Sequence, residues 1–317
     1  MIPVVILTGP TAVGKTELAL SLAAKLDTEI ISADSMQVYK TMDIGTAKPS
    51  REQQLQVKHH LIDLVGPDQD FSVADYQENF EKVVRELQHR GKIPLLVGGT
   101  GLYIRAATRS FPFQATGGPQ LELRNQLREE AEQSGPQVLH QRLQGVDPQA
   151  ASRIHPNDLH RVIRALEVFY TAGAPLSTLA RPESESVPKY RTIYIFIDRA
   201  RSELYQRIEQ RVDSMIAAGL VDEVAGLLAQ GYRPELKSMQ SLGYKQITAY
   251  LKDEVPLQTA VSQMKQLTRN YAKRQLTWFR KEPVDLWIDI SEKESEFFGE
   301  ILNYIEGRLK NLSNTYC

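Results

Sequence analysis

A glycine-rich segment between an apolar run and an amphipathic run is the feature that most constrains this chain. The apolar run Val4–Leu7 predicts a strand before it, and Thr16–Leu26 predicts a helix after it. In that context glycines let backbone N–H groups converge on an anion, and the start of the helix favours negative charge. The pattern G-x-x-x-x-G-K-[ST] therefore predicts a phosphate loop. Its residues are Gly9, Pro10, Thr11, Ala12, Val13, Gly14, Lys15 and Thr16.

Two side chains of the phosphate loop have predicted roles. Lys15 supplies a positive charge for the terminal phosphate, and the Thr16 hydroxyl is a candidate ligand for Mg²⁺. The motif indicates a polyphosphate but does not identify which one.

Further apolar runs alternate with amphipathic stretches along the chain. Because strands separated by helices form parallel sheets, we predict an α/β fold: a P-loop NTPase-like parallel sheet flanked by helices. Ser72 is the expected N-cap of one helix, Ser72–His89. The other predicted strands are Glu29–Ser32, His60–Leu64, Ile93–Val97 and Ile193–Ile197.

One long stretch departs from this alternation. Between Phe111 and Pro188 the sequence shows helical patterns, at Leu121–Gln133 and Pro156–Tyr170, and no convincing buried strand. Turn-forming residues at 116–119 and 181–184 bound the stretch. We therefore predict a catalytic core of residues 1–110 and 189–317, interrupted by an all-helical insertion of residues 111–188.

Charge and cysteine content narrow the classes of function. A net charge of −1 argues mildly against a dedicated nucleic-acid-binding domain, so any such surface is expected to be a local patch. The single cysteine, Cys317, excludes an internal disulfide and indicates a reducing compartment. No secretory signal or membrane-spanning run is evident. We expect a cytoplasmic protein, and nothing in the sequence demands more than a monomer.

Two predicted strands are followed by residues that could take part in catalysis or ligand binding. Asp34 follows the second strand, and ligands of open α/β sheets bind beyond the carboxyl ends of the strands. Its carboxylate could be a general base, a metal ligand or a turn-former, and its type alone favours the turn or the metal. Thr100 stands among glycines after the fourth strand, where the backbone either approaches a ligand or forms a flexible turn.

Basic residues after the fifth strand are ambiguous. Arg207 and Arg211 share one face of a predicted helix, and a planar guanidinium suits a diphosphate. A solvated face paired with Glu203 and Glu209 explains the same spacing, and without further information that interpretation prevails.

Near the C-terminus, basic and aromatic residues alternate without an acidic residue. Such a stretch suits phosphate contacts and base stacking, but it also fits an amphipathic helix that turns Leu267 and its aromatic residues to the core. We expect the aromatic residues mostly inward and the charges mostly outward. The basic residues are Lys265, Arg269, Lys273, Arg274, Arg280 and Lys281, and the aromatic residues are Tyr271, Trp278 and Phe279.

Segments along almost the whole chain resemble the tRNA dimethylallyltransferase family, in the order of that family. Two of these segments are Ile31–Ser50 and Thr268–Lys281, within which Asp34–Pro49 and Thr268–Arg280 are highly specific. No motif position departs from the family pattern. Without the cysteine-containing C-terminal extension of eukaryotic members, the chain resembles the bacterial type. The remaining segments are Gly9–Ala19, His59–Val65, Pro94–Ile104, Arg153–Val168, Gln206–Val224 and Ser241–Ile247.

The resemblance implies a reaction and its residues. The phosphate loop would hold dimethylallyl diphosphate, and the acceptor would be the exocyclic amine of adenosine 37 in tRNA. Asp34 would remove the amine proton, and Thr100 would give a supporting hydrogen bond. Lys15, Thr16 with Mg²⁺, and Arg211 would offset the charge on pyrophosphate. Arg207 is expected at the surface.

The resemblance also implies contacts with the tRNA. The acceptor base would be extruded into a channel, at a cost of a few kcal/mol of unstacking. The helical insertion would be a second jaw on the anticodon stem-loop, with Arg161 and Arg164 as phosphate contacts. The implied tRNA-binding residues are Asp34, Ser35, Met36, Gln37, Lys48, Thr100, Arg161, Arg164, Gly243, Lys245, Arg269, Lys273 and Arg280.

Two other classes remain open from the residues alone. A small-molecule P-loop kinase would share the fold, Lys15 and Thr16, but it would need an adenine site and usually an arginine-bearing lid. A non-catalytic RNA-binding module would not need an intact phosphate loop beside Asp34.

Overall fold

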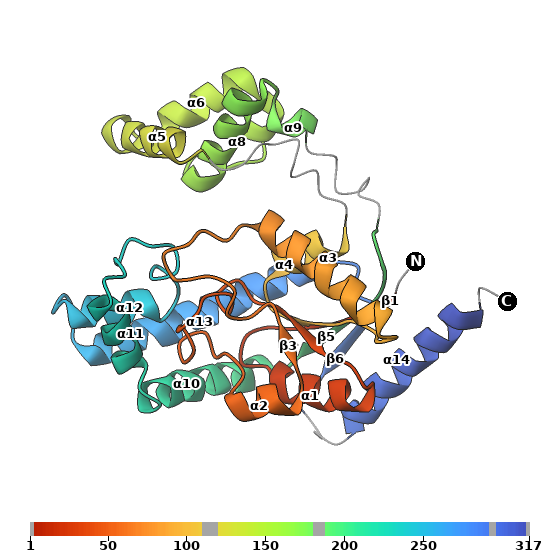
Figure 1. Cartoon of the computed structure of the whole chain (residues 1–317). Helices are drawn as coiled ribbons and strands as arrows, with labels where there is room; N and C mark the ends of the chain where they lie inside the picture. Colours follow the sequence, from red (N-terminus) through yellow and green to blue (C-terminus); the bar gives the residue numbers. More distant parts are fainter. Residues whose placement is uncertain (1–2, 110–119, 180–187, 292–295, 315–317) are drawn as a thin grey trace. The chain divides into compact units, whose positions relative to one another are not determined.

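The chain divides into two compact units. In the computed structural model the described residues are 3–109, 120–179, 188–291 and 296–314. One unit comprises Met1–Thr108 and Lys189–Cys317, and the other comprises Arg109–Pro188 (Figure 1). The turn-forming segments 116–119 and 181–184, and Cys317, lie outside the described residues.

A six-stranded sheet of order β3-β2-β4-β1-β5-β6 forms the centre of the first unit. Every neighbouring pair of strands is parallel, so the predicted parallel sheet flanked by helices is confirmed. A sixth strand beyond those predicted lies at one edge. The strands are β1 (Pro3–Thr8), β2 (Ile30–Ala33), β3 (His59–His60), β4 (Leu95–Gly98), β5 (Arg191–Asp198) and β6 (Leu286–Asp289).

The third strand is shorter than its sequence predicts. It ends at His60, whereas the apolar pattern extends to Leu64. Leu61 and Asp63 have φ angles of 61° and 54°, in the left-handed region that a strand cannot include. The backbone therefore turns away from the sheet after two residues.

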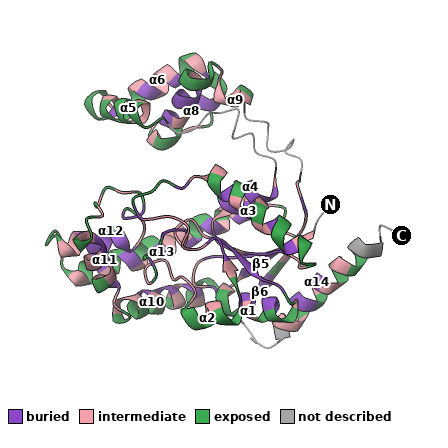
Figure 2. Cartoon of the chain, in the orientation of Figure 1, coloured by how far each residue is buried: buried purple, intermediate pink, exposed green. Residues whose placement is uncertain are grey.

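Helices cover both faces of this sheet, because alternate residues of a strand point to opposite sides. Val4 and Ile6 pack on the side of α3 and α4, and Val5 and Leu7 pack on the side of α1, α10 and α14. Figure 2 shows buried residues concentrated in the sheet and on the helix faces against it. The helices are α1 (Lys15–Lys25), α2 (Arg51–Gln56), α3 (Val73–His89), α4 (Gly101–Thr108), α10 (Arg201–Ala217), α11 (Leu220–Ala229), α12 (Tyr244–Leu251), α13 (Leu257–Phe279) and α14 (Glu296–Asn314).

Helix α3 begins where its sequence predicts. The Ser72 hydroxyl accepts a hydrogen bond from the backbone N–H of Asp75, and the Asp75 carboxylate accepts one from the backbone N–H of Ser72. This reciprocal capping box satisfies two N–H groups that a helix start otherwise leaves unpaired.

The second unit has its own apolar core. Leu139, Leu143, Val162 and Leu166 are completely buried in it. Asp147 is also buried; its carboxylate accepts hydrogen bonds from Ala150 and Ser177. Over residues 120–179 this unit contains helices and no strand: α5 (Leu121–Ser134), α6 (Pro136–Val146), α7 (Pro148–Ala151), α8 (Leu159–Ala172) and α9 (Leu176–Leu179).

Candidate active site

The phosphate loop joins β1 to α1 in a tightly curled conformation. Gly9 lies so close to β5 that a Cβ atom there would be 2.4 Å from the Ile197 carbonyl oxygen. Gly14 has a φ of 112°, which side chains rarely allow. The Lys15 ammonium donates to the carbonyl oxygens of Gly9 and Pro10, at 2.9 and 2.8 Å. The backbone of the loop thus holds the Lys15 ammonium on the concave side of the loop.

A cavity of about 530 Å³ opens at this loop, beside the carboxyl ends of β1, β2 and β4. This is the edge at which open parallel sheets bind ligands. Helices α10 and α13 supply the other walls. The lining residues include Thr11, Ala12, Gly14, Lys15, Thr16, Asp34, Gln37, Gly99, Arg207, Arg211, Tyr271 and Gln275.

The electrostatics of the cavity favour an anion. Burial, and then the nearby charge of Arg211, lower the pKa of Lys15 from 10.5 to about 7, although Asp34 acts in the opposite direction. Burial also lowers the pKa of Arg211, again opposed by Asp34. Two cations and one carboxylate therefore share a poorly hydrated space, in which a bound diphosphate would stabilise the charged form of Lys15.

The lowered pKa of Lys15 predicts pH-dependent anion binding. Because Lys15 becomes neutral as pH rises through about 7, affinity for inorganic pyrophosphate should fall above that pH, by at most about tenfold per pH unit. Equilibrium binding between about pH 6 and about pH 9 measures this. A Lys15→Arg variant keeps its charge and controls for titration of the ligand itself. Parallel curves for the two proteins would contradict the assignment.

Asp34 stands at the end of β2, facing the phosphate loop across the cavity. One of its carboxylate oxygens, Oδ1, accepts a hydrogen bond of 2.8 Å from the backbone N–H of Met36. The carboxylate thus helps to shape the turn after β2. Since Asp34 also lines the cavity, the turn does not exclude a role in chemistry.

Thr100 immediately precedes α4 and contacts the two residues that flank Asp34. Its hydroxyl accepts a hydrogen bond of 3.1 Å from the backbone N–H of Ser35, and its own N–H donates to the Ala33 carbonyl oxygen at 3.0 Å. Thr100 therefore fixes the backbone on both sides of Asp34. The glycine before it allows close contact, because a Cβ at Gly99 would be 2.2 Å from Nε2 of Gln275.

Gln275 of α13 is a site residue that the sequence analysis missed. Its Oε1 accepts a hydrogen bond from the Thr11 N–H at 2.8 Å, and its Nε2 donates to the Gly99 carbonyl oxygen at 2.9 Å. One buried amide therefore joins the phosphate loop to the turn after β4. An amide within a basic helix has no sequence signal that distinguishes this contact from others.

Arg207 corrects an expectation. We expected it at the surface, but its Nε donates a hydrogen bond of 3.0 Å to the Ala12 carbonyl oxygen, and its side chain lines the cavity. Ala12 has a left-handed φ of 64°, so this contact supports a strained peptide of the loop. Arg199, at the end of β5, similarly donates to the Val13 carbonyl oxygen at 3.3 Å. No sequence pattern predicts this contact of Arg199.

Arg211 lies one turn further along α10 and has a different environment. Within the described part of the chain it makes no hydrogen bond or ion pair, and it lines the cavity beside Asp34. A half-buried guanidinium with free donors is suited to a diphosphate. Of the two arginines, Arg211 is the one whose guanidinium makes no such contact with the loop.

The loop of residues 34–50 forms a second wall. The Gln37 amide donates to the carbonyl oxygens of Thr46 and Ala47, at 3.4 and 3.2 Å, and its oxygen accepts from Ser32 at 2.9 Å. The Gln37 side chain is thus held in place by residues 46 and 47, near the other end of the same loop.

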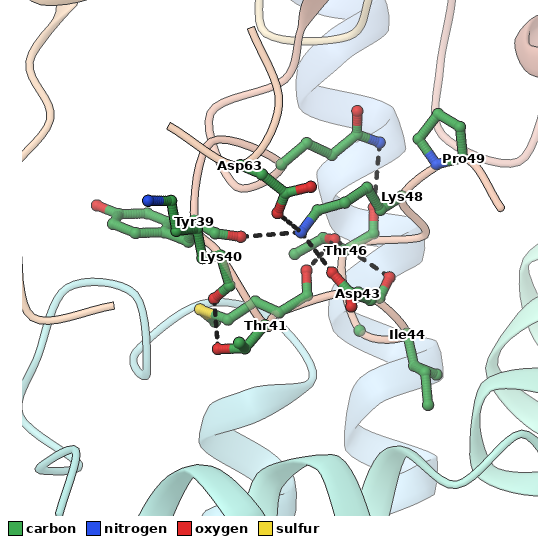
Figure 3. A network of polar contacts seen from close by, with 12 residues as sticks. Tyr39, Lys40, Thr41, Asp43, Ile44, Thr46, Lys48, Pro49 and Asp63 are labelled. Atoms are coloured by element: carbon green, nitrogen blue, oxygen red, sulfur yellow. Dashed lines mark hydrogen bonds and ion pairs between the residues drawn. The ribbon is translucent and has the colours of Figure 1, made fainter. Parts of the chain in front are cut away.

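Lys48 is the internal clamp of this loop, as Figure 3 shows. Its ammonium contacts Asp63 at 2.6 Å, Asp43 at 2.5 Å and the Tyr39 carbonyl oxygen at 2.9 Å. Only 3% of its side chain is exposed. Lys48 stays a predicted tRNA contact; in this structure its ammonium is held by Tyr39, Asp43 and Asp63.

A second cavity, of about 480 Å³, adjoins the first. It lies between the loop of residues 34–50 and α10. Arg211 and Ser214 line both cavities, together with Ala47, Lys48 and Pro49. Arg211 therefore stands where the two spaces meet.

The other predicted tRNA contacts differ in their availability. Lys245, Lys273 and Arg280 are exposed, and Gly243 is buried at the start of α12. Arg269 pairs with Glu209 at 2.6 Å. Ser35 and Met36 are half-buried beside Asp34.

In the second unit the two predicted arginines lie on α8 in different settings. Arg161 is 65% exposed and pairs with Asp158, whereas Arg164 contacts the buried Glu167.

The aromatic residues of α13 face inward, as expected, but Leu267 does not. Phe279 is fully buried. The Trp278 ring packs against Arg105, whose Cζ is 4.2 Å from the ring centroid. Leu267 is 38% exposed, so the alternative in which it faces the core does not hold for this residue.

The described residues contain no group of three or more His, Cys, Asp or Glu side chains able to hold a metal. Mg²⁺ commonly needs only one or two protein oxygens and takes the rest from phosphate and water. Thr16, which lines the cavity, fits such a site once a diphosphate is present. In the described parts of the chain no helix combines the length and the apolar character needed to cross a membrane.

Comparisons with known proteins agree with this geometry. The IPP transferase family model matches residues 37–282. A tRNA dimethylallyltransferase of Syntrophobacter fumaroxidans is 50% identical over 92% of this chain and 84% of its own length, and one of Bacillus cereus is 46% identical over 98% and 96%.

Solved structures agree as well. A full-length tRNA isopentenylpyrophosphate transferase of Bacillus halodurans matches with a TM-score of 0.75 and 40% identity, over 100% of this chain and 99% of that one. A eukaryotic dimethylallyltransferase acting on tRNA matches with a TM-score of 0.78 and 28% identity, over 93% and 75%. The resemblance predicted from the motifs is therefore confirmed, and this chain belongs to the IPP transferase family of tRNA dimethylallyltransferases.

Proposed function

We propose that this chain transfers a dimethylallyl group from dimethylallyl diphosphate to the N6 amine of adenosine 37 in tRNA. The observation that carries the proposal is the cavity in which Lys15 and Arg211 stand opposite Asp34. Two cations suit the diphosphate of the donor, and a carboxylate suits the proton of the acceptor. The names of the relatives support this activity, and the comparisons give the kinase alternative no support.

In the proposed reaction a C–O bond of the donor breaks and an N–C bond forms. The electron pair of the C–O bond leaves with pyrophosphate, and the N6 lone pair forms the new bond to the allylic carbon. The amine proton passes to Asp34. Lys15, Arg211 and the phosphate-loop N–H groups offset the charge that develops on pyrophosphate. Bound Mg²⁺, held by Thr16, would neutralise part of the same charge.

The acceptor adenosine needs a route to Asp34. A base stacked in the anticodon loop cannot reach a partly buried carboxylate, so it must be extruded, at a cost of a few kcal/mol. The two cavities that meet at Arg211 support separate approaches for donor and acceptor. We assign recognition of the acceptor to the wall formed by residues 34–50, including Gln37.

Each unit by itself carries exposed basic residues that suit the rest of the tRNA. Lys245, Lys273 and Arg280 belong to the first unit, and Arg161 to the second. Exposed ammonium and guanidinium groups suit phosphate contacts, which set affinity without reading sequence. We assign contact with the anticodon stem-loop to the helical insertion, residues 111–188, in which Arg164 contacts Glu167 on the helix that carries Arg161.

A transfer assay tests the proposed activity. Radiolabelled dimethylallyl diphosphate should label unmodified tRNA with no ATP present, because the donor itself carries the leaving group. Pyrophosphate should compete with the donor, since both occupy the phosphate loop. The matched control is the same tRNA with guanosine at position 37, which should remain unlabelled. Labelling that requires ATP, or that consumes it stoichiometrically, would overturn the proposal in favour of a kinase.

A further inference from the structure

The Glu223 side chain receives an unusual number of hydrogen bonds from the loop of residues 34–50. Its Oε2 accepts from the backbone N–H groups of Asp43 and Ile44, at 2.9 and 2.8 Å. Its Oε1 accepts from the N–H of Gly45 at 3.2 Å and from the Tyr244 hydroxyl at 2.5 Å. Three successive N–H groups pointing to one side form an anion-binding concavity. Here that concavity holds a carboxylate of the chain itself.

The loop also packs closely against Tyr244, the second partner of Glu223. Tyr244 is fully buried, and a Cβ atom at Gly45 would lie 2.4 Å from its ring. The loop therefore packs on the ring of Tyr244 at Gly45, and the N–H groups of residues 43–45 point to Glu223. Only glycine permits this approach.

The conformation held by Glu223 is one that the loop cannot maintain by propensity alone. Thr41 and Ala47 have left-handed φ angles of 63° and 47°, and such residues need surrounding contacts to persist. The Lys48 clamp acts on the loop from within (Figure 3). Glu223 acts on it from α11, through the backbone between the two strained positions.

A short path connects Glu223 to the cavity. The N–H groups it binds belong to residues 43–45, and the carbonyl groups of Thr46 and Ala47 follow directly. Those carbonyl groups accept the hydrogen bonds of the Gln37 amide, which lines the cavity with Asp34. The phosphate loop is held by other residues, Gln275, Arg199 and Arg207.

We propose that Glu223 is a positioning residue for the acceptor side of the site: it holds residues 43–47 in the form in which the carbonyl groups of Thr46 and Ala47 anchor Gln37 in the cavity wall. The inference rests on the proposed function. It predicts a division of effects, in which loss of the carboxylate impairs use of tRNA but not binding of the diphosphate donor. A merely structural role would reduce both.

Glu223→Gln tests this, because glutamine keeps the size of the side chain but loses its charge and places an amide donor against other donors. The matched control is Asp222→Asn, an exposed carboxylate in the same first turn of α11. Glu223→Gln should lower kcat/KM for tRNA by roughly tenfold to hundredfold, from weakened charged hydrogen bonds. The dissociation constant of dimethylallyl diphosphate should change less than about twofold, as should every parameter of Asp222→Asn.

A second variant keeps the inference testable if Glu223→Gln does not fold. Tyr244→Phe retains the ring under Gly45 and removes one donor to Glu223, so it should change kcat/KM for tRNA in the same direction by roughly threefold to tenfold. Hydrogen exchange at the N–H groups of residues 43–45 should accelerate in both variants. Unchanged kcat/KM for tRNA, or an equal loss of donor binding, would overturn the inference. Failure of the wild-type protein to label tRNA would instead overturn the proposed function.

Discussion

Asp34→Ala is expected to lower turnover in the transfer reaction by roughly 10²–10⁴, the range that loss of a general base usually costs. Affinity for tRNA should fall far less, because binding depends on many contacts and Asp34 provides only one. Single-turnover rates with saturating substrates measure the first quantity, and equilibrium binding of tRNA measures the second.

Two further variants separate chemistry from turn formation at Asp34. Asp34→Asn retains an oxygen that can accept the N–H of Met36, so it preserves the turn but cannot take a proton. If Asp34 is the base, the asparagine variant should be nearly as slow as the alanine variant. Recovery of turnover in Asp34→Asn would reduce Asp34 to a turn-former. Glu17→Ala, at an exposed carboxylate on the cavity rim, should leave turnover almost unchanged.

Local signals were sufficient to predict the sheet and the phosphate loop. Apolar strands of four or more residues, the Gly9–Thr16 pattern and the Ser72 cap each depend on neighbours in sequence, and each was found in the structure. The third strand was overpredicted for a related reason: the apolar pattern continues to Leu64, but the left-handed Leu61 turns the backbone away. Periodicity reports burial and does not report such a turn.

Contacts between distant segments could not be predicted in the same way. Gln275 is 264 residues from Thr11, and Glu223 is 180 residues from Asp43. The spacing of Arg207 and Arg211 placed them on one face of a helix but did not show that the face is turned to the phosphate loop. Lys48 is a further case, because the type of the residue does not reveal that its side chain is buried against Asp43 and Asp63.

Arg211→Lys is expected to lower turnover by roughly 10- to 100-fold, although the charge is kept. A planar guanidinium can place two N–H groups on the leaving diphosphate, and an ammonium cannot reproduce that geometry. Arg211 has the free donors for this contact, since within the described residues it forms no hydrogen bond or ion pair of its own. The loss should appear in kcat, because the charge on pyrophosphate is greatest as the C–O bond breaks.

Arg207→Lys should behave differently, because its contact is with the loop and not with the ligand. Loss of the hydrogen bond to Ala12 is expected to weaken binding of both dimethylallyl diphosphate and pyrophosphate by roughly twofold to tenfold, with a smaller change in kcat. Arg201→Lys, at an exposed arginine of the same helix, is the matched control and should be near wild type. Measured kcat and pyrophosphate affinity for the three variants decide the assignment. An equal fall in kcat for Arg207→Lys and Arg211→Lys would mean that Arg211 has no special contact with the leaving group, and that both arginines act by shaping the phosphate loop.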